Sequence, residues 1–235
     1  MAWSIVQHAS LAQDASATTI VLAFSSNIGT AKSALIVCIS CDIGLTVSSV
    51  TDSLGNTYGG AESDSGTAQR ADIYVAEDSG AGGANTVTVT FSATTGHRRI
   101  AIFEITGQNA PGTGNFTDQA NGTSGSGTAA NAPSVTTLFD GELVLSHVIA
   151  EADSTLTAGT HLSFTKDEDF GHTTVVAGVE DGTQATAGAI VADWTLGTSR
   201  NYIAQVLTLR PAAAAAAKTP ADWPHSRGFQ PFIAT

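Results

Sequence analysis

The 235-residue chain has only two cysteines, and charged residues make up 13% of it, about half of the usual share of roughly 25%. Cys38 and Cys41 are three positions apart, so in a strand they lie on opposite faces and cannot form a disulfide. Two residues also cannot complete a four-ligand zinc site by themselves. We therefore interpret both cysteines as small buried hydrophobic side chains and expect packing to supply the stability.

Positive charge is also scarce. The chain has 9 basic and 21 acidic side chains, a formal charge of −12. Affinity for a phosphate backbone depends on clustered Lys and Arg, so the composition argues against nucleic acid and against an anionic membrane surface as partners. There is no basic N-terminal region followed by a long apolar run, and no apolar segment of membrane-spanning length. We expect a soluble chain that is made in the cytoplasm.

Short apolar or alternating segments separated by Gly-rich turns dominate what is present. Residues 34–39 are almost continuously apolar, which predicts a central strand covered on both faces. Residues 85–91 alternate apolar and hydroxyl side chains, residues 93–96 break the pattern, and residues 99–105 resume it, which we interpret as a β-hairpin. About twelve strands and no amphipathic helix are expected. The fold class is therefore all-β, a β-sandwich or jelly roll.

The pattern recurs at an offset of 103 positions, which places Phe91 on Trp194. We interpret residues 1–107 and 133–210 as two pseudo-repeats joined by a Gly/Ser-rich loop, residues 108–132. One fused β-sandwich over residues 1–210 is favoured over two tandem domains, because the first half begins with extra strands. Phe91 and Trp194 are expected to be equivalent and buried in the core.

Beyond Arg210 the strand pattern stops. Residues 211–235 contain six consecutive alanines and four of the six prolines of the chain, which predicts an extended C-terminal arm. Its large apolar side chains are costly to leave in water, and an arginine can add a bidentate contact to a carboxylate. We predict that the arm docks in a groove of another chain, a lattice protein or a second copy. The alternative is that it folds back on its own sandwich. The predicted partner-binding residues are Trp223, Arg227, Phe229 and Phe232.

No segment has the pattern of a catalytic or metal site. The small residues 122–127 lack the strand and helix context of a nucleophile elbow, and sequence alone does not place Glu77 near Glu180 as a glycosidase pair. His161 and His172 bracket residues 166–169 and could ligate a divalent ion, although a solvated hairpin tip also explains them. Asp52 and Asn56 could bind calcium, although turn chemistry also explains both. We therefore expect no catalytic residues, no metal and no cofactor.

Three segments together carry a resemblance: Val50-Thr51-Asp52-Ser53-Leu54-Gly55-Asn56-Thr57-Tyr58, residues 85–91, and Phe103-Glu104-Ile105-Thr106-Gly107. In these the chain resembles a group of β-sandwich proteins of bacteria and their tailed phages. The resemblance covers residues 1–210 and implies a fold and a surface-exposed setting, with no catalytic residues to carry over.

In phages such sandwiches act as head decoration or cement proteins and as tail appendages. The implied function is thus a structural protein on the virion surface, made in the host cytoplasm. It would bind the major capsid protein or another virion lattice and could form a homo-oligomer. The alternative is a carbohydrate-binding or adhesion module on a tail appendage or cell surface, which would expose two or three aromatic rings in one plane.

Overall fold

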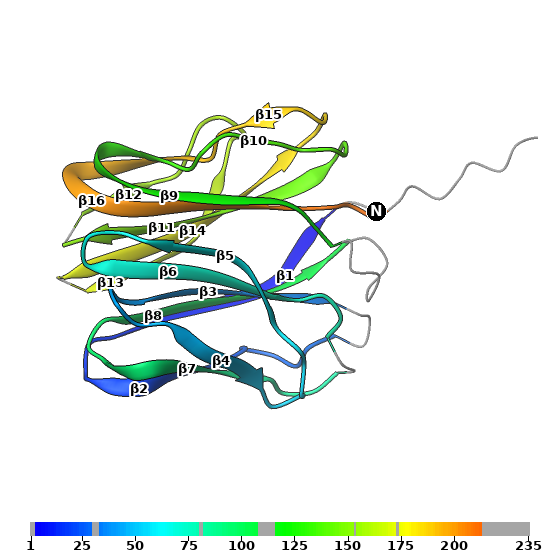
Figure 1. Cartoon of the computed structure of the whole chain (residues 1–235). Coiled ribbons are helices and arrows are strands. Elements are labelled where there is room, and N and C mark those ends of the chain that lie inside the picture. The colour runs from blue at the N-terminus through cyan, green and yellow to red at the C-terminus, as the bar shows by residue number, and fades with distance from the viewer. Residues whose placement is uncertain are drawn as a thin grey trace, which may run out of the picture.

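The computed structural model describes residues 3–29, 33–79, 82–107, 116–152, 154–172 and 174–212, without the side chain of His172. Over these residues the protein is all-β, and its strands form antiparallel sheets stacked in four layers (Figure 1). The described residues form sixteen strands, more than the roughly twelve expected, and three of them are two residues long.

The first half of the chain supplies two layers. The outer one has the order β2 (Ala17–Ala23), β7 (Thr86–Thr95), β4 (Val47–Asp52). The inner one has the order β1 (Ser4–Gln13), β8 (Arg98–Thr106), β3 (Ala34–Asp42), β6 (Gln69–Ala76), β5 (Gly59–Ser65).

The second half supplies the other two layers. The inner one runs β9 (Thr117–Asn131), β16 (Asp193–Leu209), β11 (Glu142–Glu151), β14 (Val175–Gln184), β13 (Thr165–His172), and β12 (Leu156–Thr157) also pairs with β16. The outer one is the short pair β10 (Val135–Thr136) and β15 (Ala189–Ile190). The two inner sheets have matching strand orders, because each strand of the second inner sheet has the number of the corresponding strand of the first inner sheet plus eight.

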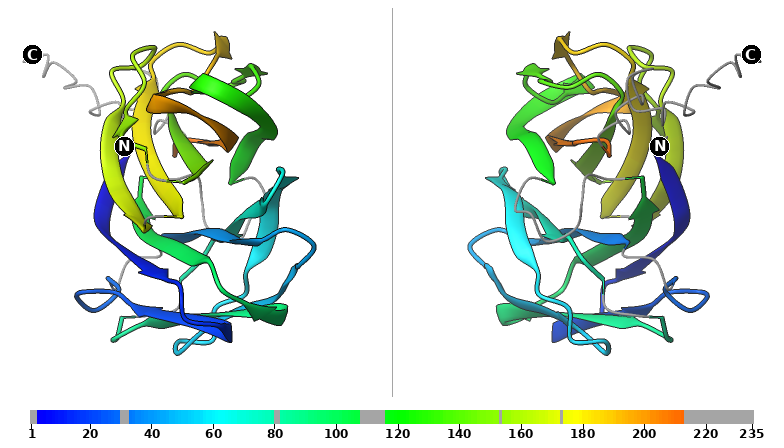
Figure 2. Two further views of the ribbon diagram at one scale, coloured as in Figure 1. Left: turned by 90° about the vertical axis from the view of Figure 1, so that its left-hand side faces the viewer. Right: turned by 90° about the vertical axis from the view of Figure 1, so that its right-hand side faces the viewer.

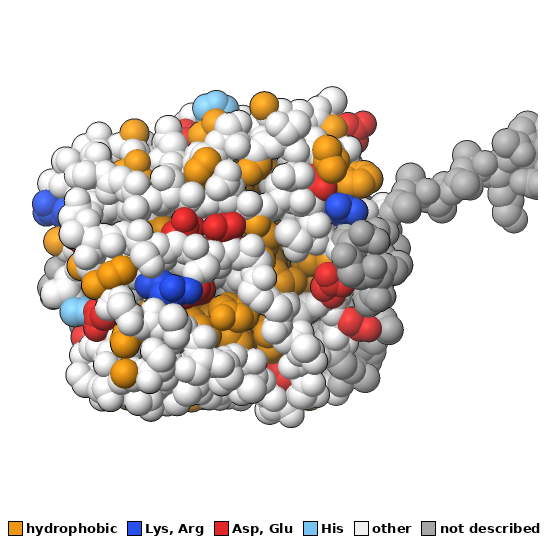
Figure 3. All heavy atoms as spheres, viewed as in Figure 1, with side chains coloured by type: hydrophobic (Ala, Val, Ile, Leu, Met, Phe, Trp, Pro, Cys, Tyr) orange, Lys and Arg blue, Asp and Glu red, His pale blue; other side chains and the backbone are white. Residues whose placement is uncertain are grey.

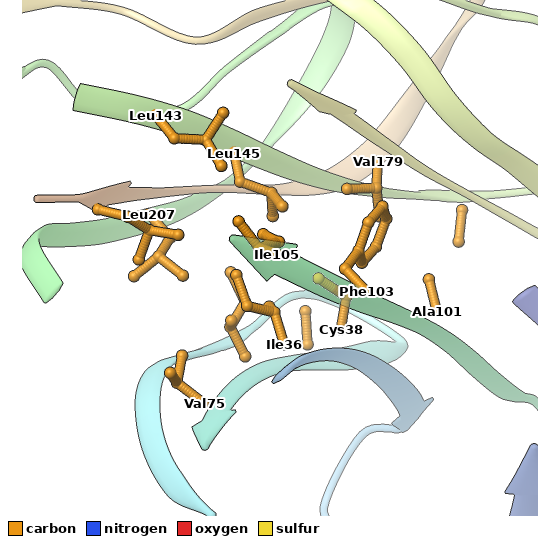
Figure 4. Close-up of a cluster of buried hydrophobic side chains, with 14 of the residues drawn as sticks. Ile36, Cys38, Val75, Ala101, Phe103, Ile105, Leu143, Leu145, Val179 and Leu207 are labelled. Atoms are coloured by element: carbon orange, nitrogen blue, oxygen red, sulfur yellow. The ribbon is translucent and has the colours of Figure 1, made fainter. Parts of the chain in front are cut away.

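The two inner sheets pack face to face over one apolar cluster, which we call the central cluster. Ile36, Cys38 and Phe103 enter it from β3 and β8, and Leu145 and Val179 enter it from β11 and β14 (Figure 4). A second cluster lies between the inner and outer sheets of the first half. Two further clusters cover the face of β11 that points away from the central cluster. Both faces of β3, β8 and β11 are therefore covered, which explains why these strands are buried almost throughout.

Edge strands and polar contacts close both sides of this seam between the halves. On one side β1 lies along β13 (Figure 2), and His8 Nδ1 is 2.7 Å from Glu168 Oε1. On the other side β5 lies along β9, and Gln205 Nε2 donates to Asp64 Oδ2 at 2.9 Å. The guanidinium of Arg99, fully buried, crosses the seam and donates to the carbonyl of Val175 at 3.0 Å.

Two sequence interpretations are wrong. Residues 85–91 and 99–105 form strands β7 and β8, but these are not a hairpin, because β7 pairs with β2 and β4 whereas β8 pairs with β1 and β3. The alternating strand covers one face of an outer sheet, and the continuously apolar strand belongs to an inner sheet. The break at Gly96 is where the chain passes from one layer to the next.

The expected loop over residues 108–132 is also wrong for Thr117–Asn131, which form the 15-residue strand β9. Residues 108–115 lie outside the described residues. Neighbouring side chains occupy the space that side chains of β9 would need: a Cβ on Gly122 would lie 1.8 Å from Asp64 Oδ2, and one on Gly125 would lie 2.6 Å from the Tyr202 hydroxyl. The glycines therefore fit closely beside these two side chains, and the small residues of β9 lack the alternation of apolar side chains that marks a strand in a sequence.

The burial predictions are confirmed. Cys38 and Cys41 are free thiols with no exposed surface, and burial raises the pKa of both. Phe91 and Trp194 are 3% and 1% exposed, and the indole Nε1 of Trp194 donates to Ser146 Oγ at 2.9 Å.

Truncating either buried ring should therefore be costly. We expect Phe91→Ala and Trp194→Ala each to lower the free energy of unfolding by about 3–5 kcal/mol, because each leaves a cavity. Chemical denaturation measures this, with Phe139→Ala as a matched control at a ring that is 42% exposed. A buried-ring variant as stable as the control would contradict the assignment of that ring to the core.

Candidate functional site

The residues predicted to bind a partner, Trp223, Arg227, Phe229 and Phe232, lie outside the described residues. Of the predicted arm, the structure describes only Pro211 and Ala212. The backbone N–H of Ala212 donates to the carbonyl of Gly107 at 2.8 Å, which ties the end of the described chain to the end of β8.

An exposed apolar surface lies close to this end of the described chain. Leu138 and Phe139, in the turn between β10 and β11, are 61% and 42% exposed. The guanidinium of Arg210 lies 4.9 Å from the centroid of the Phe139 ring, within cation–π range. We call Leu138, Phe139 and Arg210 the rim patch. Apolar side chains gather beside a basic one at this corner of the molecule (Figure 3).

Two carboxylates fix the turn that carries the rim patch. Glu142 Oε1 accepts from the backbone N–H groups of Leu138 and Phe139 at 3.1 and 2.9 Å, and Asp118 Oδ2 accepts from that of Leu138 at 2.9 Å. Burial raises the pKa of Glu142, although its hydrogen bonds to Thr208 and to the backbone of Phe139 act in the opposite direction. The turn is thus held by its backbone, while its two large apolar side chains extend into solvent.

A second surface feature is a cleft of about 310 Å³ over β5 and β6. Along β6, Ala71, Ile73 and Val75 enter the central cluster, so the alternate residues Arg70, Asp72 and Tyr74 lie on the opposite face. The outer sheet on that side has three strands and the inner sheet has five. The β5–β6 end of the inner sheet is left open, and the cleft forms there.

The polar groups of the cleft are held in fixed positions. Arg70 donates from Nε and Nη2 to the two carboxylate oxygens of Asp72, both at 2.9 Å, and Nη2 also donates to Ser63 Oγ. The hydrogen bonds to Asp72 raise the pKa of Arg70. Burial, followed by the charge of Asp64, raises the pKa of Glu62.

The third feature is a carboxyl pair, Asp167 and Asp181, beside the β1 edge of the seam. A bulge in β13 between Lys166 and Glu168 contains Asp167. Burial, followed by the nearby Asp181 carboxylate, raises the pKa of Asp167 to about 8, and burial raises the pKa of Asp181. Two adjacent carboxyls that cannot both ionise share one proton. At neutral pH the pair therefore carries about one negative charge.

The side chain of His172 lies outside the described residues, and His161 and the acidic residues Glu168 and Asp169 contact separate partners. Glu168 accepts from Ser10 at 2.6 Å across the seam, Asp169 pairs with Lys166 at 2.7 Å, and His161 pairs with Asp193 at 3.3 Å. Over the part of the chain that the structure describes, no group of three His, Cys, Asp or Glu residues is placed to hold a metal ion.

Turn chemistry accounts for Asp52. Its Oδ1 accepts from the backbone N–H groups of Leu54 and Asn56, and its Oδ2 accepts from the side chains of Asn56, Tyr58 and Asn85, all within 3.1 Å. These hydrogen bonds hold the pKa of Asp52 low against the opposing effect of burial. Five donors occupy the oxygens that a calcium ion would need.

Of the two glutamates considered as a glycosidase pair, Glu180 is fully buried within β14, where its Oε2 accepts from the backbone N–H of Gly159 at 2.7 Å. Burial raises the pKa of Glu180 to about 8. Glu77 directly follows the end of β6.

No family model, curated protein or solved structure matches the chain. Within the described residues there is no helix with the length and hydropathy needed to cross a membrane.

Sequence reasoning missed the cleft and the carboxyl pair. The signal for the cleft was present, because Arg70, Asp72 and Tyr74 alternate with three apolar residues, which is typical of a strand with one uncovered face. No local signal marks Asp167 and Asp181, since their proximity depends on the pairing of β13 with β14.

The carboxyl pair should make stability depend on pH. An unfolded aspartic acid titrates near 4, so between about pH 4 and 8 the unfolded chain has lost a proton that Asp167 retains in the folded state. The stabilisation that protonated Asp167 gives to the folded state is therefore complete below about pH 4, and it is lost as pH rises to about 8. Asp167→Asn is neutral at every pH. Its melting temperature, relative to that of the unaltered protein, should therefore rise from pH 5 to pH 8.

Comparing the melting temperatures of Asp167→Asn and the unaltered protein at the same pH removes the effects of other titrating groups. For example, burial lowers the pKa of His147 to about 4. The stability that neutral His147 contributes is lost as pH falls below about 6.5, but this loss is the same in both proteins. Asp169→Asn, on the same strand, is the control and should show no such trend. A constant difference in melting temperature between Asp167→Asn and the unaltered protein would contradict the shared-proton assignment.

Proposed function

We propose that the chain is a non-enzymatic structural protein of a phage virion, a capsid decoration or cement protein on the virion surface that binds the assembled lattice of the major capsid protein. It is made in the host cytoplasm, and neither nucleic acid nor membrane is its partner. Trp223, Arg227, Phe229 and Phe232 of the arm, residues 211–235, are the main partner-binding residues.

The observation that carries the proposal is the rim patch. A lattice-binding protein needs apolar contacts at the arm and at the rim of the sandwich, and Leu138 and Phe139 are exposed at the rim. Arg210 lies against Phe139 and is two residues from the end of the described chain. Arm and rim would therefore contact the same neighbouring surface.

The use of basic side chains supports a protein partner over a phosphate-rich one. Arg70 pairs with Asp72, Arg98 donates to main-chain carbonyls, Lys166 pairs with Asp169, and Arg210 pairs with Asp118. Arg99 is fully buried. Side chains engaged in this way do not form the clustered basic surface that binding to phosphate requires.

We further propose that each half is a jelly roll and that the two halves are pseudo-repeats fused into one domain. The matching strand orders of the two inner sheets support this, as does the 103-residue offset that relates Phe91 to Trp194. Most successive strands alternate between the inner and outer sheets of the first half, as in a jelly roll.

The alternative is a carbohydrate-binding or adhesion module, and the burial of the two aromatic residues considered for it argues against it. Phe91 and Trp194 are buried and cannot serve as stacking platforms. Among the described residues, Tyr74 in the cleft favours saccharide binding, and it is compatible with a virion protein.

The proposed function predicts separable effects of two changes. Deleting residues 218–235 should abolish co-sedimentation with capsids and leave the melting temperature almost unchanged, because all sixteen strands of the described residues precede position 218 in the chain. The double variant Leu138→Ser with Phe139→Ser should weaken attachment, by at least about tenfold if each side chain contributes roughly 1 kcal/mol or more on burial.

Val21→Ser is the matched control, since Val21 is exposed on β2 in the opposite outer layer. It should attach as the unaltered protein does. Undiminished attachment of the truncated chain would rule out the arm as the anchor, and failure of the full-length protein to sediment with capsids would overturn the proposal.

A further inference from the structure

The cleft over β5 and β6 has the composition of a site for a small polar ligand. Such sites combine an apolar or aromatic surface with a few polar groups in fixed positions. Tyr74 supplies the aromatic ring, and Arg70 with Asp72 supplies a guanidinium and a carboxylate locked together by two 2.9 Å hydrogen bonds. Figure 3 shows basic and acidic side chains together over β5 and β6, with apolar atoms directly below them.

A glycine leaves the tyrosine ring open on its β5 side. Gly60 is the cross-strand partner of Tyr74, and a Cβ on Gly60 would touch the ring at 3.7 Å. Any side chain at position 60 would cover part of the ring. The bulge between Gly60 and Glu62 adds to this by bending the edge strand locally.

The charges of the cleft select against ionic ligands. Asp72 is 2% exposed and neutralises the Arg70 guanidinium that donates to it, so an anion finds no uncompensated positive charge and is repelled at longer range by the net charge of −12. A cation would meet the guanidinium of Arg70. A neutral ligand with several hydroxyl groups meets neither penalty, because hydroxyls accept from Arg70 and can donate to or accept from the hydroxyl of Ser63.

We propose that this cleft binds a neutral saccharide, with one sugar ring stacked on Tyr74 and its hydroxyls hydrogen-bonded to Arg70 and Ser63. A volume of about 310 Å³ is at the small end for ligand sites, so it holds about one or two sugar rings. The site is independent of the arm and of the rim patch. A virion protein with such a site would add glycan contact to lattice binding.

The experiment is titration of the full chain with maltotriose, cellotriose, N,N′,N″-triacetylchitotriose and lactose, followed by amide NMR shifts. At least one should shift the amides of residues 59–63 and 70–74, with a roughly millimolar dissociation constant, because an open cleft buries little of the ligand. Tyr74→Ala and Arg70→Ala should each weaken binding by at least about tenfold. Arg200→Ala is the control for lost charge and should bind as the unaltered protein does.

Gly60→Val tests the same site without removing a polar group. Gly60 does not have a positive φ and a Cβ there makes an ordinary contact, so the fold should persist while the added methyl groups cover the ring. Thermal melts establish that each variant is folded. No shift with any of the four saccharides overturns the proposal, as does undiminished binding by folded Gly60→Val, or tighter binding of the anionic probe glucose 6-phosphate or the cationic probe arginine amide.

Discussion

The packing of the two inner sheets over the central cluster is the constraint on which the rest of the structure depends. Ile36 and Phe103 from one half meet Leu145 and Val179 from the other, and no water-facing side remains on either sheet at this seam. The central strands of each inner sheet, such as β3, β8 and β11, are therefore covered on both faces, which requires apolar side chains at almost every position. The outer sheets need only one buried face, and their strands alternate.

The same constraint limits where function can reside. A polar group at the seam must find an internal partner, as Arg99 does with the carbonyl of Val175 and Gln205 does with Asp64. Such groups stabilise the stack and are closed to ligands. Accessible chemistry is left to the margins: the turn that carries Leu138 and Phe139, the open end of the β5–β6 face, and the edge where Asp167 meets Asp181.

What the sequence predicted well was local, and what it missed depended on neighbours distant in the chain. Residues 34–39 and the alternation over 85–91 identify strands and their burial, because each pattern reflects the environment of a single strand. The link between β7 and β8 looks like a hairpin turn, since a turn between strands does not reveal whether the chain stays in one sheet. Strand β9 was missed because its glycines, two of which lie against Asp64 and Tyr202, and its small polar residues give no apolar alternation. The cleft was missed because its existence depends on how far the outer sheet extends.

The central claim is that the four layers are one cooperative unit and not two sandwiches in tandem. Differential scanning calorimetry of the full chain tests this most directly. Because each inner sheet would expose one face if its partner unfolded, the account predicts a single transition with a calorimetric enthalpy equal to the van't Hoff enthalpy. Two separate transitions, or a calorimetric enthalpy about twice the van't Hoff value, would contradict it.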